Sequence, residues 1–208
     1  MPSSTNTVWV VTGGNRRIGL GFVKALLARP SVTVIATVRN DRARSALEDA
    51  TANLVKGDGT VLRIAQLDFT TALSPEQIRN SFHIDHVDEL WPLLQKSSAP
   101  QVINVSSSVG CITYHKVVAS AYGPSKAALN WLTSALHQRN EALIAFALHP
   151  GFVRTEMGES AATEWGFPHA MLECVEQAVK ESLEIIDSAT RENVSGKFVS
   201  YKGQELPW

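Results

Sequence analysis

The chain has 208 residues, 44% of them hydrophobic and 19% charged, with a formal net charge of −1. This length suits one domain with a sizeable core, so residues 1–208 are expected to form a single domain. The balanced charge gives no electrostatic case for binding nucleic acid or an anionic membrane. The N-terminus lacks the basic-then-apolar run of a signal peptide, and no apolar stretch approaches the ~20 residues that span a bilayer. The two cysteines, Cys111 and Cys174, lack metal-ligand spacing, and these features together favour a cytoplasmic protein with reduced thiols.

Short apolar runs alternate along the chain with segments that carry apolar residues at helical spacing. The runs that predict strands are residues 8–11, 32–38, 61–67, 102–105, 143–148 and 196–201. The segments that predict helices are residues 22–28, 41–51, 74–96, 122–140 and 171–189, with Trp91 and Trp131 at core-like positions. The first run, Val8–Val11, does not alternate with polar residues and is typical of a strand buried on both faces. This order predicts an α/β fold of the Rossmann type, a doubly wound parallel sheet with helices on both faces.

The first strand leads into a glycine turn, Thr12-Gly-Gly-Asn-Arg-Arg-Ile-Gly19, which opens the first helix. At such a turn the backbone N–H groups and the helix dipole favour a phosphate group. Arg16 and Arg17 add positive charge that suits an anionic ligand, although two solvated arginines beside a structural turn are the alternative.

The end of the second strand indicates which nucleotide would bind. Folds that bind NAD place an acidic residue there to accept a hydrogen bond from the ribose 2′-hydroxyl. This chain has Thr37-Val-Arg39-Asn instead, with no carboxylate before Asp41. Because Arg39 can pair with a 2′-phosphate, the pattern favours NADPH over NADH, with a solvated loop arginine as the alternative.

Tyr122 and Lys126 lie four residues apart at the start of a predicted helix. Residues at this spacing share a helix face, so the phenol and the ammonium are expected to be neighbours. The ammonium stabilises the phenolate and would let Tyr122 exchange a proton with a carbonyl or alkoxide oxygen near neutral pH. A pair at this spacing is common by chance, so its context decides its meaning.

That context is a serine-rich turn upstream and a Pro-Gly segment downstream. Asn104-Val-Ser-Ser-Ser-Val-Gly110 ends the fourth strand, and His149-Pro-Gly-Phe-Val-Arg-Thr-Glu-Met157 ends the fifth. With the glycine turn and Leu67-Asp68-Phe69, these segments resemble, in order and position, the motifs of the short-chain dehydrogenase/reductase family. The ending, residues 195–208, is similar to that of fungal ketoreductases like norsolorinic acid reductase, which act on aromatic polyketides. The resemblance covers nearly the whole chain and implies an oxidoreductase that uses NADP(H).

The resemblance also implies roles for single residues. Tyr122 would protonate the substrate oxygen, Ser107 would orient it, with Ser108 as a register alternative, and Lys126 would bind the ribose and tune Tyr122. The cofactor contacts that it implies are Gly13, Asn15, Arg16, Ile18, Arg39, Asp68, Tyr122, Lys126, Val153 and Thr155. Residues 155–169 would be the variable substrate loop, for which no element is predicted.

The chain departs from the family pattern at two single positions. Arg17 replaces the middle glycine of the turn Thr-Gly-x-x-x-Gly-x-Gly, where a glycine lets the backbone approach the pyrophosphate. The family segment Phe-x-Val-Asn, which supplies the asparagine of the catalytic tetrad, stands here as Phe82-His-Ile-Asp85.

A third departure is a missing segment. Only Phe69–Leu73 separate Asp68 from Ser74, the predicted cap of the next helix, whereas a crossover between strands needs at least ~10–12 residues. The family's central strand, which ends in Asn-Asn-Ala-Gly, therefore has no counterpart. We favour a sheet contracted to about six strands in which residues 102–105 pair with residues 8–11. A partner chain that fills the gap, or a truncated form with an incomplete cofactor pocket, are the alternatives.

Three functions follow from these features. The leading one is an NADPH-dependent reductase of a small-molecule ketone, such as a polyketide. The alternatives are a redox-neutral cyclase, isomerase or dehydratase and a non-catalytic binding protein. The cluster His83, Asp85, His86 and Asp88 is interpreted as a solvated helix face, so no metal is predicted. A homodimer or tetramer would pair through the long helix that begins at Tyr122.

Overall fold

The structure is a computed structural model and describes residues 6–68, 70, 90–113, 117 and 119–208. The chain forms two compact units, Met1–Leu93 and Leu94–Trp208. The predicted cap at Ser74, the segment Phe82–Asp85 and the cluster His83–Asp88 lie outside the described residues.

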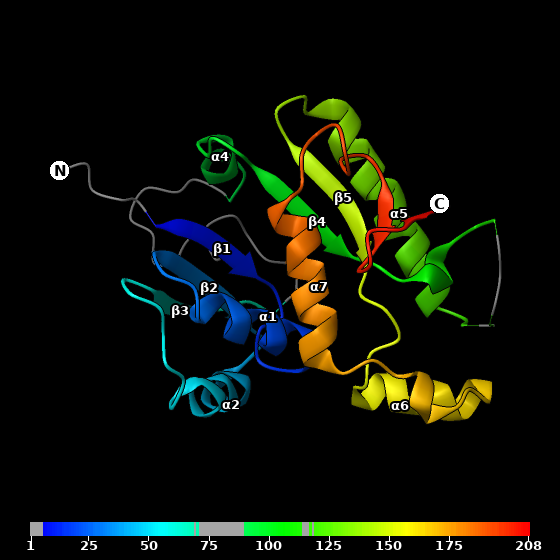
Figure 1. The fold of residues 1–208 in the computed structure, drawn as a ribbon, viewed down its shortest axis with the longest axis horizontal. Helices are drawn as coiled ribbons and strands as arrows, with labels where there is room; N and C mark the ends of the chain where they lie inside the picture. Colours follow the sequence, from blue (N-terminus) through cyan, green and yellow to red (C-terminus); the bar gives the residue numbers. More distant parts are fainter. Residues whose placement is uncertain (1–5, 69, 71–89, 114–116, 118) are drawn as a thin grey trace. The chain divides into compact units, whose positions relative to one another are not determined.

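The first unit holds a three-stranded parallel sheet in the order β1-β2-β3 (Figure 1). Its elements are β1 Thr7–Val11, α1 Arg17–Leu27, β2 Val32–Val38, α2 Asp41–Thr51 and β3 Val61–Gln66. Helix α1 packs against β1 and β2, and α2 packs against β2 and β3. The core forms where the apolar stripe of α1, with Val23, Leu26 and Leu27, meets the buried strand β2.

Strand β1 is the edge of this sheet in the described structure, and its burial differs from the expectation. Val8 is 58% exposed and Val10 is 42% exposed, so the prediction of a strand buried on both faces is wrong. The reason is pairing: β1 bonds to β2 on one side, with Val8 opposite Thr33, and among the described residues no strand pairs with its other side.

The second unit holds a four-stranded sheet in the order β4-β5-β6-β7, parallel except for the last pair. Its strands are β4 Gln101–Val105, β5 Ile144–His149, β6 Phe198–Ser200 and β7 Glu205–Leu206. Its helices are α5 Tyr122–Arg139, α6 Glu156–Trp165 and α7 Val175–Asp187, with short 3₁₀ turns η1 Ser108–Gly110 and η2 His169–Met171. Helix α4, Leu90–Gln95, spans the boundary between the units along the chain. Helix α5 packs against β4 and β5.

The α/β class and the parallel strands are confirmed, but the sheet organisation differs from the contracted sheet of about six strands. The described residues form seven strands, in one sheet of three and one of four, and neither sheet pairs β1 with β4. Because the Ser106 N–H donates to the Leu148 carbonyl, the carbonyl of Val105 faces the opposite edge of β4. That carbonyl accepts a hydrogen bond from Lys126 Nζ at 2.9 Å, so a side chain satisfies a group that a neighbouring strand would otherwise take.

The last residues of the chain fold back onto the start of the turn that follows β4. The Cys111 thiol donates to the carbonyl of Pro207 at 3.1 Å, and the Ile112 N–H donates to the carbonyl of Trp208 at 3.0 Å. The Trp208 ring stacks on Phe198 with centroids 6.1 Å apart. This tail therefore covers part of the core around Cys111.

Trp131 on α5 is 71% exposed, so its predicted place in a core is wrong. Within the described chain, no helix combines the length and the apolar character needed to cross a membrane.

Candidate active site

The glycine turn is tied to the end of β2 by two hydrogen bonds. The Gly13 N–H donates to the Thr37 hydroxyl at 3.2 Å, and the Gly14 N–H donates to the Thr37 carbonyl at 3.1 Å. Gly19 packs so closely on this turn that a Cβ there would lie 2.3 Å from the Gly13 carbonyl oxygen. The space beside Gly13 is open, since a Cβ built there would meet no atom within 4 Å. The turn is thus fixed from one side and accessible from the other.

Arg17 adopts a backbone conformation that few side chains tolerate. Its φ is +53°, in the left-handed region that glycine enters freely and other residues enter at a cost of roughly 1–2 kcal/mol. The family's glycine at this position therefore has a conformational reason here, besides room for the pyrophosphate. Arg16, which precedes it, is exposed and extended, and both side chains place positive charge at the start of α1.

Arg39 and Asp68 follow the ends of the neighbouring strands β2 and β3. The Leu67 N–H donates to the Val38 carbonyl at 2.8 Å and keeps these ends together. The hydroxyl and the N–H of Thr70 both donate to the Asp68 carboxylate and lower its pKa, and the Arg39 guanidinium lowers it further. Both charged side chains are therefore present at the edge where the sequence predicts the adenosine end of a nucleotide.

In the second unit, the serine turn sits directly on the first turns of α5. Ser107 is buried and caps η1, its Oγ accepting from the Val109 N–H at 3.3 Å. A Cβ on Gly110 would lie 2.7 Å from the Cβ of Lys126, so the turn approaches the helix as closely as glycine permits. This contact brings Ser107 into the same packed assembly as the helix start that carries Tyr122 and Lys126.

Tyr122 and Lys126 are neighbours on α5, as predicted. The Lys126 ammonium lies over the Tyr122 ring, 5.6 Å from its centroid, and Tyr122 is 37% exposed. Burial lowers the pKa of Lys126, because it penalises the charged form. The ammonium has three donors and spends one on the Val105 carbonyl, so two can serve a bound ligand.

A buried polar network, which the sequence analysis did not identify, holds the serine turn to α5. The Ser106 hydroxyl donates to Asn130 Oδ1 at 2.5 Å, and Asn104 Nδ2 donates to the Thr133 hydroxyl at 2.8 Å. Asn130 lies four residues after Lys126, and this spacing was the available signal. His149 also belongs here, since its Nδ1 accepts from the Ser108 N–H at 3.4 Å.

Of the two predicted cofactor contacts in the Pro-Gly segment after β5, Val153 is buried and Thr155 caps a helix. Val153 is buried and forms a bridge with Glu173, whose N–H and carbonyl bond to Phe152 and Arg154. Thr155 caps α6, its hydroxyl oxygen accepting from the Gly158 N–H at 3.1 Å. The Thr155 hydroxyl proton remains available to donate.

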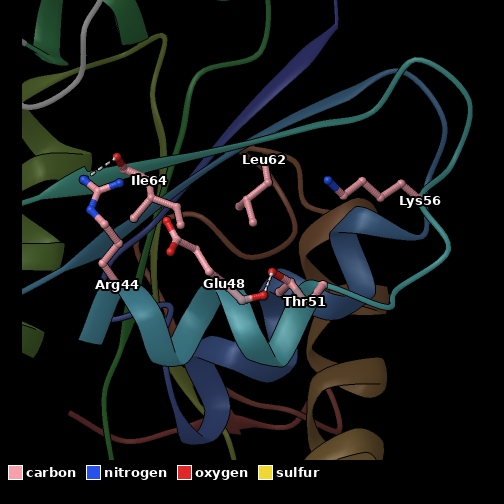
Figure 2. A pocket seen from close by; sticks show the side chains of 7 residues that line it. Arg44, Glu48, Thr51, Lys56, Leu62 and Ile64 are labelled. Atoms are coloured by element: carbon pink, nitrogen blue, oxygen red, sulfur yellow. Dashed lines mark hydrogen bonds between the residues drawn. The ribbon is translucent and has the colours of Figure 1, made fainter. Parts of the chain in front are cut away.

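Groups of metal-ligating side chains are not found in the described part of the chain, and Cys111 and Cys174 are free thiols. A surface pocket of about 420 Å³ lies between α2 and β3 (Figure 2). The side chains that line it include Arg44, whose guanidinium donates to the Ile64 carbonyl at 3.3 Å, and none of the predicted site residues.

Comparison with known proteins decides the family. A family model described as short chain dehydrogenase matches residues 80–165. The chain is 32% identical to short-chain dehydrogenase RED3 of Pyricularia oryzae, over 99% of this chain and 100% of the relative. The chain belongs to the short-chain dehydrogenase family. The norsolorinic acid ketoreductase of Aspergillus parasiticus is 30% identical over 97% of this chain and 91% of its own length.

Solved structures of a carbonyl reductase and a short-chain dehydrogenase share this fold. The NADPH-bound carbonyl reductase from chicken fatty liver has a TM-score of 0.67 and 25% identity, over 98% of this chain and 94% of the other. A short-chain dehydrogenase from Salmonella enterica has a TM-score of 0.74 at 21% identity, over 97% and 99% of the two chains. The alignment with the Pyricularia relative spans 253 positions, so at least 45 of them have no counterpart in the 208 residues of this chain. A missing internal segment accords with that difference in length.

Proposed function

We propose that this short-chain dehydrogenase is an NADPH-dependent ketoreductase. The observation that carries the proposal is the close packing of η1, which Ser107 caps, on the first turns of α5, which bear Tyr122 and Lys126. The names of the relatives support the reaction, since several are ketoreductases and one solved neighbour is a carbonyl reductase bound to NADPH. The alternatives are a redox-neutral enzyme and a non-catalytic binding protein.

The residues of the first unit fit the anionic part of the cofactor. The open space beside Gly13 and the positive charge of Arg16 suit a pyrophosphate, with Asn15 and Ile18 completing the turn. Arg39 would pair with a 2′-phosphate, and Asp68 would contact the adenine. The choice of NADPH over NADH rests on Arg39.

The residues of the second unit would carry out the proton transfer. NADPH, when bound, supplies a hydride to the carbonyl carbon. Ser107 would hold the substrate oxygen by a hydrogen bond, and Tyr122 would give that oxygen its proton. Lys126 would hold the ribose with its remaining donors and stabilise the phenolate. Val153 and Thr155 would contact the carboxamide of the nicotinamide.

We propose a planar aromatic ketone, such as an aromatic polyketide, as the substrate. Three rings cluster after the Pro-Gly segment: Phe152 stacks on Trp165 at 6.2 Å, and Phe167 meets both rings edge-on. Phe167 of this cluster is exposed, and so are Met157 on α6 and Met171 at the end of η2. Aromatic faces and thioethers are suited to a flat, polarizable ligand. The norsolorinic acid ketoreductases among the relatives support the same class.

The experiment is to titrate NADPH and NADH into the purified protein while following nicotinamide fluorescence. We expect tighter binding of NADPH, oxidation with aromatic ketones, and loss of that oxidation in Tyr122→Phe. Phe167→Ala is expected to raise KM for aromatic ketones and leave it unchanged for small aliphatic ones. Binding of neither nucleotide would exclude the reductase.

A redox-neutral enzyme is the second candidate, and one observation favours it. Arg17, with a φ of +53°, stands in the glycine turn at the position where the family has a glycine that lets the backbone approach the pyrophosphate. Conversion of an aromatic substrate without any change in NADPH, yet still dependent on Tyr122, would establish this alternative.

We also propose a homodimer or tetramer through α5, whose exposed face includes Trp131 and Leu132. Light scattering of wild type and Trp131→Glu tests this, because a charge in an apolar interface should dissociate it. The free thiols of Cys111 and Cys174 support our proposal of a cytoplasmic location.

A further inference from the structure

The backbones of Tyr201 and Glu173 both form hydrogen bonds with the Pro-Gly segment. The Tyr201 N–H donates to the His149 carbonyl at 2.8 Å, and its phenol donates to Glu173 Oε2 at 3.1 Å. The Glu173 N–H donates to the Phe152 carbonyl, and its own carbonyl accepts from the Arg154 N–H, both at 2.8 Å. The hydrogen bond between the Tyr201 and Glu173 side chains therefore links the two residues whose backbones bind the two ends of residues 149–154.

The Tyr201 ring also limits how closely the backbone at Gly151 can approach. Gly151 has a φ of +90°, and a Cβ there would lie 2.8 Å from Tyr201 Cε1. The backbone at Gly151 therefore packs against the Tyr201 ring with no room for a side chain. Shifting the ring would shift Gly151, and Val153 follows two residues later.

We propose that Tyr201 and Glu173 are positioning residues that hold the segment His149–Thr155 in the place needed for Val153 and Thr155 to meet the nicotinamide. This inference rests on the proposed function, because the roles of Val153 and Thr155 come from it. Neither Tyr201 nor Glu173 touches the reacting atoms, and both act through the segment.

The Tyr201 phenol is the donor in its hydrogen bond with Glu173, because a carboxylate can only accept. Burial raises the pKa of Tyr201, so the phenol keeps its proton at neutral pH and donates to the carboxylate. The Lys202 ammonium lies 5.2 Å from the centroid of the Tyr201 ring, and the phenol in turn raises the pKa of Lys202. The pair therefore needs an acceptor at position 173 but no negative charge as such.

This requirement defines the variants. Tyr201→Phe removes the phenol oxygen and keeps the ring under Gly151, whereas Glu173→Leu removes the acceptor. Glu173→Gln keeps a carbonyl oxygen that can accept, so it should behave nearly as wild type. Glu176→Gln is the matched control, because Glu176 is an exposed residue of the first turn of α7.

The experiment compares the dissociation constants of NADPH and of 2′,5′-ADP, which lacks the nicotinamide. We expect Tyr201→Phe and Glu173→Leu to raise the dissociation constant of NADPH about tenfold and to leave that of 2′,5′-ADP unchanged. Both dissociation constants should stay close to the wild-type values in Glu173→Gln and Glu176→Gln. A variant that had merely lost stability would bind both ligands more weakly, or neither of them more weakly. Wild-type affinity for NADPH in Tyr201→Phe overturns the inference.

Hydrogen exchange supplies a readout that needs no ligand. The Arg154 N–H should exchange faster in Tyr201→Phe than in wild type, while the Gly158 N–H, which Thr155 holds locally, should not change. If the wild type binds neither nucleotide, the proposed function fails and the exchange result still decides whether the pair holds the segment. Unchanged exchange at Arg154 overturns the proposal.

Discussion

Gly110→Ala tests whether the serine turn must lie directly on α5. A Cβ at Gly110 would lie 2.7 Å from Lys126 Cβ, 2.8 Å from the Lys126 carbonyl carbon and 2.9 Å from the Ala127 nitrogen. Ordinary contacts between carbon atoms are about 3.5–4.0 Å, so the turn and the helix must separate by nearly ~1 Å. Two of the three atoms are backbone and cannot rotate away.

We expect this overpacking to lower the free energy of unfolding by about 1–3 kcal/mol. Because a misplacement of ~1 Å in a catalytic group can cost about 100-fold, the rate of ketone reduction should fall by a similar factor. Thermal unfolding measures the first effect, and oxidation of NADPH under saturating cofactor measures the second.

Gly123→Ala is the matched control, since Gly123 faces the same turn from α5. Its added Cβ would meet the Val109 carbonyl oxygen at 3.2 Å and Val109 Cγ1 at 3.7 Å, which asks for a shift of only a few tenths of an ångström. Alanine also favours the helix by up to ~1 kcal/mol, so stability should be unchanged or higher. Equal melting temperatures for Gly110→Ala and wild type would refute the close contact, as would an equal loss in both variants.

Arg17→Gly should raise the free energy of unfolding by about 1 kcal/mol, because glycine adopts a φ of +53° without strain. Ser31→Gly, at a φ of +54°, should raise it by a similar amount, as measured by thermal unfolding. Only Arg17→Gly should alter the affinity for NADPH. A loss of stability in both would contradict the assigned strain. Arg39→Ala should weaken NADPH about tenfold and leave NADH unchanged in fluorescence titrations, since one charge-assisted hydrogen bond to the 2′-phosphate is lost; equal weakening of both nucleotides would remove Arg39 from that role. Because burial lowers the pKa of Lys126, its positive charge is lost as pH rises through a value below the ~10.4 of an exposed lysine. We therefore expect kcat/KM to fall as the pH rises, beginning at a pH below the ~10.4 of an exposed lysine. A kcat/KM that stays constant up to that pH would count against a role for the charged Lys126.

The positions of most elements follow from short-range patterns. Strand β2 and helix α2 begin and end at the predicted residues, and the structure adds an Asn40 cap whose side chain accepts from the Ala43 N–H. Helix α6 was missed although its signals are local. Thr155 caps it, Glu156 lies in its first turn and Gly166 ends it in the left-handed conformation.

The site was predictable where its parts are close in sequence. Tyr122 and Lys126 are neighbours because a helix joins them, and the serine motif lies within one turn of chain. The bond from Lys126 to Val105 was not predictable, because it depends on which edge of β4 is left without a strand. The pairing of Tyr201 with Glu173 likewise joins residues 28 positions apart through the packing of two loops.

The contact between Cys111 and Pro207 joins residues 96 positions apart in the sequence. On the ribosome, Cys111 is therefore synthesised long before Leu206 and Trp208, which pack against the core cluster that contains it. Contacts of such high sequence separation slow folding, because a long loop has to close before they form. The second unit should thus complete its fold only after Trp208 has left the exit tunnel, and a pause in synthesis before that point would leave the core cluster around Cys111 open to chaperones and proteases.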